Sequence, residues 1–205
     1  MKVSSIQFIL DKMPQNMIVH ANNTACLAYM MGKAINCSSE ELEQLWFAGL
    51  LHESGKLIIN QLLDFDDIPD SINKLSTRSK NKKHVLFTLA LLAPLEEFQS
   101  VRTIISQVFE NVDGSGEPNK LYAEEIDTLA KVVRICSEYD NKRLAGDPHE
   151  AVCRDLKTMA NKVLPQKIIN PFMKAIIMSG LYKEYDEINN FEIGGAPDFD
   201  LLMVI

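Results

Sequence analysis

The stretch SSEELEQLWFAGLLHESGKL, residues 38–57, predicts a helix whose start and end can both be read from the residues. Ser38 or Ser39 can cap the first turn, with Glu41 or Leu42 at the third position. Leucine and alanine then recur at helical spacing as far as Gly55, which gives the helix one buried face. The segment is therefore predicted to pack against other helices.

Two polar residues interrupt the apolar end of this helix. His52 and Glu53 are adjacent and leave from its C-terminal turn, and Lys56 follows one turn beyond His52. An imidazole, a carboxylate and a cation at a helix end suit a divalent metal ion together with a phosphate. This segment is the first candidate for a functional site.

Helical spacing also marks most of the remaining chain, and no segment alternates apolar and polar residues as a strand would. The predicted helices cover residues 18–31, 81–92, 95–108, 123–144, 147–163 and 165–179. In the last of these, Gly180 supplies the stop signal. The pattern predicts an all-α fold.

Composition and charge limit the class of protein. The chain has 205 residues, of which 46% are hydrophobic and 24% charged, as in one ordinary globular domain. A net charge of −7 disfavours nucleic acid and anionic membranes as partners. No apolar run reaches the roughly 18 residues of a membrane span, the N-terminus makes a weak secretory signal, and the four cysteines form no CxxC pair. A cytoplasmic protein is expected. The basic residues between Lys74 and Lys83 either contact phosphate or only face water.

Three of the four histidines, His20, His52 and His84, lie within apolar helical stretches. A single histidine in such a place is more often a buried core residue than a ligand. His149 follows Asp147-Pro148 at a helix start and receives no role.

Three segments of the chain resemble motifs of one protein family and occur in the same order as in that family. Residues 38–57 resemble the segment of the HD phosphohydrolase superfamily that usually reads LLHDIGK at the His-Asp doublet. ENVDGSGEP, residues 110–118, is similar to the HHExxDGSGYP signature of the HD-GYP subfamily, and residues 124–141 resemble its next helix. The resemblance covers about residues 15–180 and implies a divergent HD-GYP domain that folds as a single HD-type helical bundle. Residues 1–14 would form an N-terminal helical extension and residues 181–205 a C-terminal tail.

The resemblance also implies roles for individual residues. Metal ligands are implied at His20, His52, Glu53 and His84, with Glu53 in the place of the bridging aspartate. Lys56 matches the lysine that contacts phosphate. The substrate-binding loop would contain Asp113, Gly114, Gly116 and Glu117, the last of which replaces the tyrosine of the GYP triplet.

Several other positions depart from the family pattern. Ser137 aligns with the last aspartate of the first metal site, for which Glu138 or Asp140 could substitute. Val108 and Phe109 align with the paired histidines of the second site and cannot coordinate an ion. We therefore expect either no metal or one divalent transition metal, iron or manganese, and no dinuclear site.

Two functions follow from this pattern. The first is a degenerate HD-GYP-like regulatory module that binds a nucleotide or a signalling protein and has no cyclic di-GMP phosphodiesterase activity. The alternative is a metal-dependent phosphohydrolase with a reduced metal site, acting on a cyclic dinucleotide or another nucleotide. Neither requires nucleic acid or a membrane, and a homodimer is left open.

Overall fold

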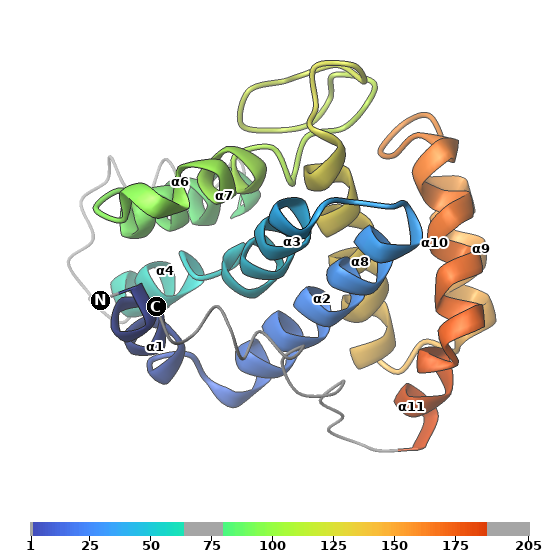
Figure 1. Ribbon diagram of the computed structural model, residues 1–205, viewed down its shortest axis with the longest axis horizontal. Helices are drawn as coiled ribbons and strands as arrows, with labels where there is room; N and C mark the ends of the chain where they lie inside the picture. The colour runs from blue at the N-terminus through green and yellow to red at the C-terminus, as the bar shows by residue number, and fades with distance from the viewer. Residues whose placement is uncertain (1, 64–79, 188–205) are drawn as a thin grey trace.

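The computed structural model describes residues 2–63 and 80–187, and within these ranges it contains helices and no strand (Figure 1). The predicted all-α fold class is confirmed. The elements are α1 (Lys2–Asp11), α2 (Gln15–Ala34), α3 (Ser39–Leu51), α4 (Lys56–Leu63), α6 (Lys80–Leu92), the 3₁₀ turn η1 (Glu96–Phe98), α7 (Gln99–Ile105), α8 (Thr128–Leu144), α9 (His149–Thr158), α10 (Gln166–Ser179) and α11 (Leu181–Glu187). None of the helices in the described ranges has both the length and the apolar character needed to cross a bilayer.

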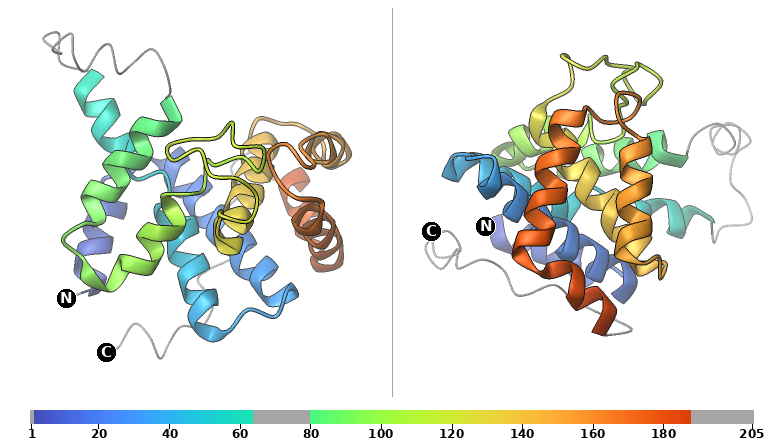
Figure 2. Two further views of the ribbon diagram at one scale, coloured as in Figure 1. Left: turned by 90° about the horizontal axis from the view of Figure 1, so that it is seen from above. Right: turned by 90° about the vertical axis from the view of Figure 1, so that its right-hand side faces the viewer.

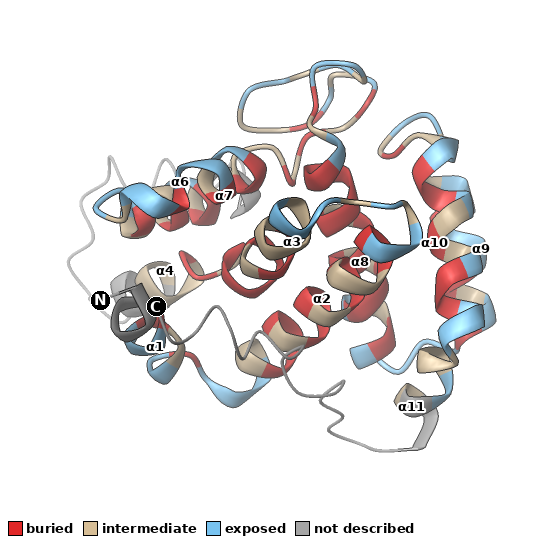
Figure 3. Cartoon of the chain, in the orientation of Figure 1, coloured by how far each residue is buried: buried red, intermediate tan, exposed pale blue. Residues whose placement is uncertain are grey.

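Helices α2, α3 and α8 form the centre of the molecule, and α2 contacts both of the others. Helices α6 and α7 lie on one side of this centre, while α9 and α10 lie on the other, as the left view of Figure 2 shows. The long connection between α7 and α8 crosses the top of the bundle in Figure 1. The buried faces of α2, α3 and α8 turn toward one another (Figure 3).

The close approach of α3 to α2 depends on Gly49. A β-carbon at this position would lie 2.7 Å from the Cα atom of Ala25 on α2, which is closer than packed atoms approach. Helix α3 begins with the predicted capping box: the Glu41 amide donates to the Ser38 hydroxyl at 3.2 Å, and the Ser38 amide donates to the Glu41 carboxylate at 2.7 Å. This cap and this contact fix the direction in which the end of α3 points.

The turn after α3 is pressed against α6. A β-carbon at Gly55 would lie 2.0 Å from the carbonyl oxygen of His84 and 2.5 Å from the amide nitrogen of Thr88. The Gly55 amide instead donates to the Thr88 hydroxyl at 2.8 Å. Residues 52–55 are thus held between α3 and α6, which brings His84 close to His52.

Three of the predicted helices have wrong boundaries. The segment predicted from residue 123 becomes helical only at Thr128, because Asp127 caps the helix by accepting from the Leu129 amide at 2.7 Å. The helix predicted over 147–163 ends at Thr158 and is followed by turns. The helix predicted over 95–108 starts with the turn η1 and ends at Ile105.

Two further predictions concern the C-terminal tail and the basic stretch. Residues 181–187, expected to be tail, form α11. The basic stretch from Lys74 to Lys83 lies mostly outside the described residues.

Candidate metal centre

Three side chains from two parts of the fold meet at the turn that follows α3. His20 comes from the second turn of α2, His52 from the end of α3, and Glu53 from the residue after it. Each offers one ligand atom, and these atoms lie within 4.8 Å of one another. The Nε2 atom of His20 is 3.8 Å from Oε2 of Glu53, and both histidines are buried.

Hydrogen bonds at Nδ1 set the orientation of both imidazole rings. The Nδ1–H of His52 donates to the carbonyl oxygen of Gly49 at 2.8 Å, an atom that can only accept. The Nδ1–H of His20 donates to Oδ2 of Asp140 at 2.6 Å. Each ring therefore directs the lone pair of its Nε2 atom inward, which is how histidine ligands of metals are held.

Asp140 orients His20 from behind. This carboxylate on α8 is fully buried and also accepts from the Asn23 amide at 2.9 Å and the Tyr185 hydroxyl at 2.5 Å. Asp140 is one of the two predicted substitutes for Ser137 as a ligand. It contacts Nδ1 of His20 and not the Nε2 atom that faces the centre, so it lies behind this ligand. Glu138, the other substitute, pairs with Arg134 at 2.9 Å instead. Each carboxylate thus has partners elsewhere, and neither belongs to the group of His20, His52 and Glu53.

Ser137 occupies the gap between the two histidines. Its hydroxyl lies 3.1 Å from Nε2 of His52 and 3.3 Å from Nε2 of His20. A hydroxyl has one hydrogen and can donate to only one of these two lone pairs. One buried Nε2 acceptor is therefore left without a donor in the described structure, and a bound cation would satisfy it.

The local charges favour the ligand forms of these residues. Burial lowers the pKa of His52 to about 3, so its imidazole is neutral at pH 7. Burial acts to raise the pKa of Glu53, but electrostatic interactions with His52, His20 and Lys56 outweigh this effect, and the pKa is lowered to about 2. The Lys56 ammonium lies 2.5 Å from Oε1 of Glu53. Lys56 thus reaches the site through this ion pair.

The residues fit one divalent ion. Two imidazole nitrogens and one carboxylate oxygen are donors that iron, manganese and zinc accept, and three protein ligands leave a position open for water or substrate. His20, His52 and Glu53 would hold the ion, and Asp140 and Gly49 would orient the two histidines.

The fourth predicted ligand, His84, lies outside this group of three. It is buried on α6 and close enough to His52 that its charge also lowers the pKa of that residue. Its ring meets the edge of Phe109, with centroids 4.8 Å apart and planes at 89°. Val108 is almost wholly buried in the core. Val108 and Phe109, which align with the paired histidines of the family, thus offer a core side chain and an aromatic ring. A ligand role for His84 stays a prediction.

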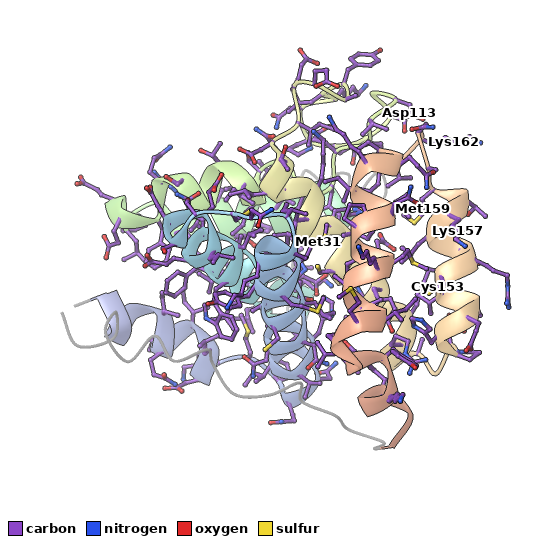
Figure 4. All side chains as sticks on the ribbon, turned by 45° about the vertical axis from the view of Figure 1, so that its right-hand side comes forward. Met31, Asp113, Cys153, Lys157, Met159 and Lys162 are labelled. Atoms are coloured by element: carbon purple, nitrogen blue, oxygen red, sulfur yellow. The ribbon has the colours of Figure 1, made fainter. Side chains whose placement is uncertain are left out.

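The predicted substrate loop, with Asp113, Gly114, Gly116 and Glu117, belongs to the connection between α7 and α8. Asp113 accepts from the Ser115 hydroxyl at 2.5 Å and from its amide at 3.0 Å, and these bonds lower the Asp113 pKa. The Asp113 amide donates to the Lys162 carbonyl at 3.1 Å, and Figure 4 shows Asp113 and Lys162 side by side. The loop is thus tied to the segment before α10, and its contact with substrate stays a prediction.

Sequence reasoning missed the residues behind the centre. Asn23 and Tyr185 bind Asp140 from positions 117 residues before it and 45 residues after it. The one available signal was a polar pair, Asn22-Asn23, within an apolar helix face.

The chain is similar to known proteins over most of its length. The family model described as HD domain matches residues 5–161. A 3′3′-cGAMP-specific phosphodiesterase of Vibrio cholerae serotype O1 is 24% identical over 122 residues, which are 59% of this chain and 26% of that protein. The crystal structure of a cyclic GMP-AMP-specific phosphodiesterase from V. cholerae superposes with a TM-score of 0.66 at 13% identity, covering 97% of this chain and 57% of that one. The chain therefore spans only part of each of these relatives.

Proposed function

Since this chain belongs to the HD domain family, we propose that it is a nucleotide-binding module that holds one divalent metal ion and recognises the phosphate of a cyclic dinucleotide without hydrolysing it. The two relatives named above act on cyclic GMP-AMP, which supports a cyclic dinucleotide as the ligand class. The regulatory function expected from the sequence is thereby kept, with a metal ion included.

The observation that carries this proposal is the pair of inward-facing Nε2 atoms on His20 and His52. Asp140 would have little reason to be fully buried behind His20 with three donors if the imidazole had no ligand to hold. A buried carboxylate is costly unless it is hydrogen-bonded, and these bonds serve the orientation of one ring. The arrangement supports a working metal site.

Hydrolysis would need more than this centre offers. A bound divalent ion supplies a Lewis acid to a phosphate oxygen, but a two-metal mechanism also stabilises the leaving oxygen. Val108 and Phe109 offer no ligand for a second ion. The remaining residues serve binding: Lys56 brings a positive charge beside Glu53, and His52 stays neutral as an acceptor.

One observation favours a second candidate, a phosphohydrolase with a single metal ion. Two histidines and one glutamate with an open fourth position form the ligand pattern of catalytic rather than structural zinc sites. Such an enzyme would act slowly on a cyclic dinucleotide or another nucleotide.

Metal analysis combined with a turnover assay separates the candidates. The protein is purified, loaded with manganese or ferrous iron, and assayed for metal content and for binding and cleavage of cyclic GMP-AMP and cyclic di-GMP. We expect one ion per chain, nucleotide binding, and no cleavage above the buffer control. His52→Ala should lose the ion, whereas His149→Ala, which removes a buried imidazole bonded to Tyr139, should keep it. Metal-dependent turnover lost in His52→Ala favours the hydrolase, and two ions per chain contradict the proposal.

A further inference from the structure

Arg134 lies on α8 one turn before Ser137, outside the three-residue metal group. The spacing of three residues places the two side chains on neighbouring positions of the helix, about 4.5 Å apart along its axis. Only 12% of the Arg134 side chain is exposed, and burial lowers the pKa of its guanidinium. A buried cation of this kind requires partners.

The described residues provide only part of what this guanidinium can bind. Its Nη2 atom lies 2.9 Å from Oε1 of Glu138. The buried Nε and Nη1 atoms have no hydrogen-bond partner among the residues that the structure describes. These donors belong to a planar group that matches the oxygens of a phosphate or a carboxylate.

Phe109 fixes the place of the guanidinium. The Cζ atom of Arg134 lies 4.9 Å from the centroid of the Phe109 ring, and the edge-on partner of that ring is His84. His84 is in turn close enough to His52 for their charges to interact. Arg134, Phe109 and His84 therefore form a row of side chains, and its His84 end lies near His52 of the metal centre.

The charge of the chain indicates which ligand this row suits. A net charge of −7 repels an anion at long range, so an anionic ligand depends on cations built into its site. Lys56 supplies such a charge beside Glu53, and Arg134 supplies a second one beyond Phe109. Two separated cations suit a ligand with two separated phosphates.

We propose that Arg134, held on the ring of Phe109, binds a second phosphate group of a nucleotide whose first phosphate lies at the metal centre. The proposal rests on the function proposed above and deepens it. Glu138 occupies one edge of the guanidinium, and the buried Nε and Nη1 donors, which have no partner among the described residues, are left to bind the ligand. The positive charge of Arg134 thus acts on the side of the centre where Val108 and Phe109 leave no second metal site.

The test compares ligands that carry one or two phosphates. Binding of cyclic di-GMP and of 5′-GMP is measured by calorimetry on the manganese-loaded full chain. Arg134→Gln is expected to weaken cyclic di-GMP binding by about 10- to 100-fold and 5′-GMP binding by less than about twofold. Arg154→Gln, an exposed arginine on α9, is the matched control and should change neither affinity.

Two further variants keep the proposal testable if Arg134→Gln does not fold. Arg134→Lys retains the charge but not the planar donors, and it should weaken cyclic di-GMP binding by a smaller factor. Glu138→Gln removes the competing carboxylate and should tighten cyclic di-GMP binding severalfold. A purely structural arginine–glutamate pair would not produce that gain.

Each of the other outcomes has a definite meaning. Equal weakening of both ligands by Arg134→Gln, no weakening by it, or weaker binding in Glu138→Gln would overturn the second-phosphate site while leaving the proposed function in place. A metal-loaded wild-type protein that binds neither ligand would overturn both proposals.

Discussion

Acid should destabilise the metal-free protein mainly through His52. Its pKa is about 3 in the folded protein, against an ordinary value of 6.5. The unfolded chain therefore takes up a proton at this residue below pH 6.5 while the folded protein does not, and the free energy of unfolding falls as the pH is lowered. The slope rises to about 1.4 kcal/mol per pH unit as the unfolded histidine becomes protonated, so the loss between pH 6.5 and 4.5 is about 2 kcal/mol.

This pH range separates His52 from its neighbour Glu53. The pKa of Glu53 is lowered from 4.5 to about 2, so the stability that this carboxylate contributes is present above pH 4.5 and is lost only below it. For a protein of this size, about 2 kcal/mol corresponds to roughly 4 to 8 °C in the melting temperature. The effect is therefore large enough to measure in a thermal melt.

The assay is urea and thermal unfolding at half-unit steps from pH 6.5 to 4.5, with a chelator present so that no metal ion contributes. The same series on His52→Asn subtracts every other titrating group, because the amide can donate to the Gly49 carbonyl but does not titrate. We expect the wild type to lose about 2 kcal/mol more than the variant over this range. Parallel pH profiles of the two proteins would show that the pKa of His52 is not lowered in the folded protein.

Three further predictions test the centre and its support. Asp140→Asn should weaken manganese binding by about 10- to 100-fold in a calorimetric titration, because His20 loses the carboxylate that orients it, whereas the exposed-site control Asp155→Asn should bind normally. Ser137→Asp places a carboxylate between the two Nε2 atoms and should tighten manganese binding, while Ser137→Asn, of similar size but uncharged, should not; equal affinities would show that residue 137 does not face the ion. Gly55→Ala puts a β-carbon 2.0 Å from the His84 carbonyl oxygen and should destabilise the protein by about 1–3 kcal/mol in urea unfolding; an unchanged midpoint would mean that α6 is not pressed against this turn.

The helical architecture and the chemical character of the site can both be predicted from local features of the sequence. Apolar residues at spacings of three and four specify a buried helix face, and the capping box at Ser38 depends on atoms three residues apart. These are local relations, so they can be read without knowing the fold. The resemblance to HD-GYP domains then singled out His20, His52 and Glu53, which the structure places within ligand distance of one another.

The hydrogen bonds that hold these residues, and the side chains beside them, depend on the packing of helices that are distant in the sequence. The bond from His20 to Asp140 joins residues 120 positions apart, and its existence depends on how closely α2 and α8 pack and which faces they present. The placement of Arg134 over Phe109 depends likewise on the path of the connection before α8. Helical periodicity shows which face of each helix is buried, but it does not show which residue of a distant helix that face will meet, because the meeting point is set by the packing of all the helices together.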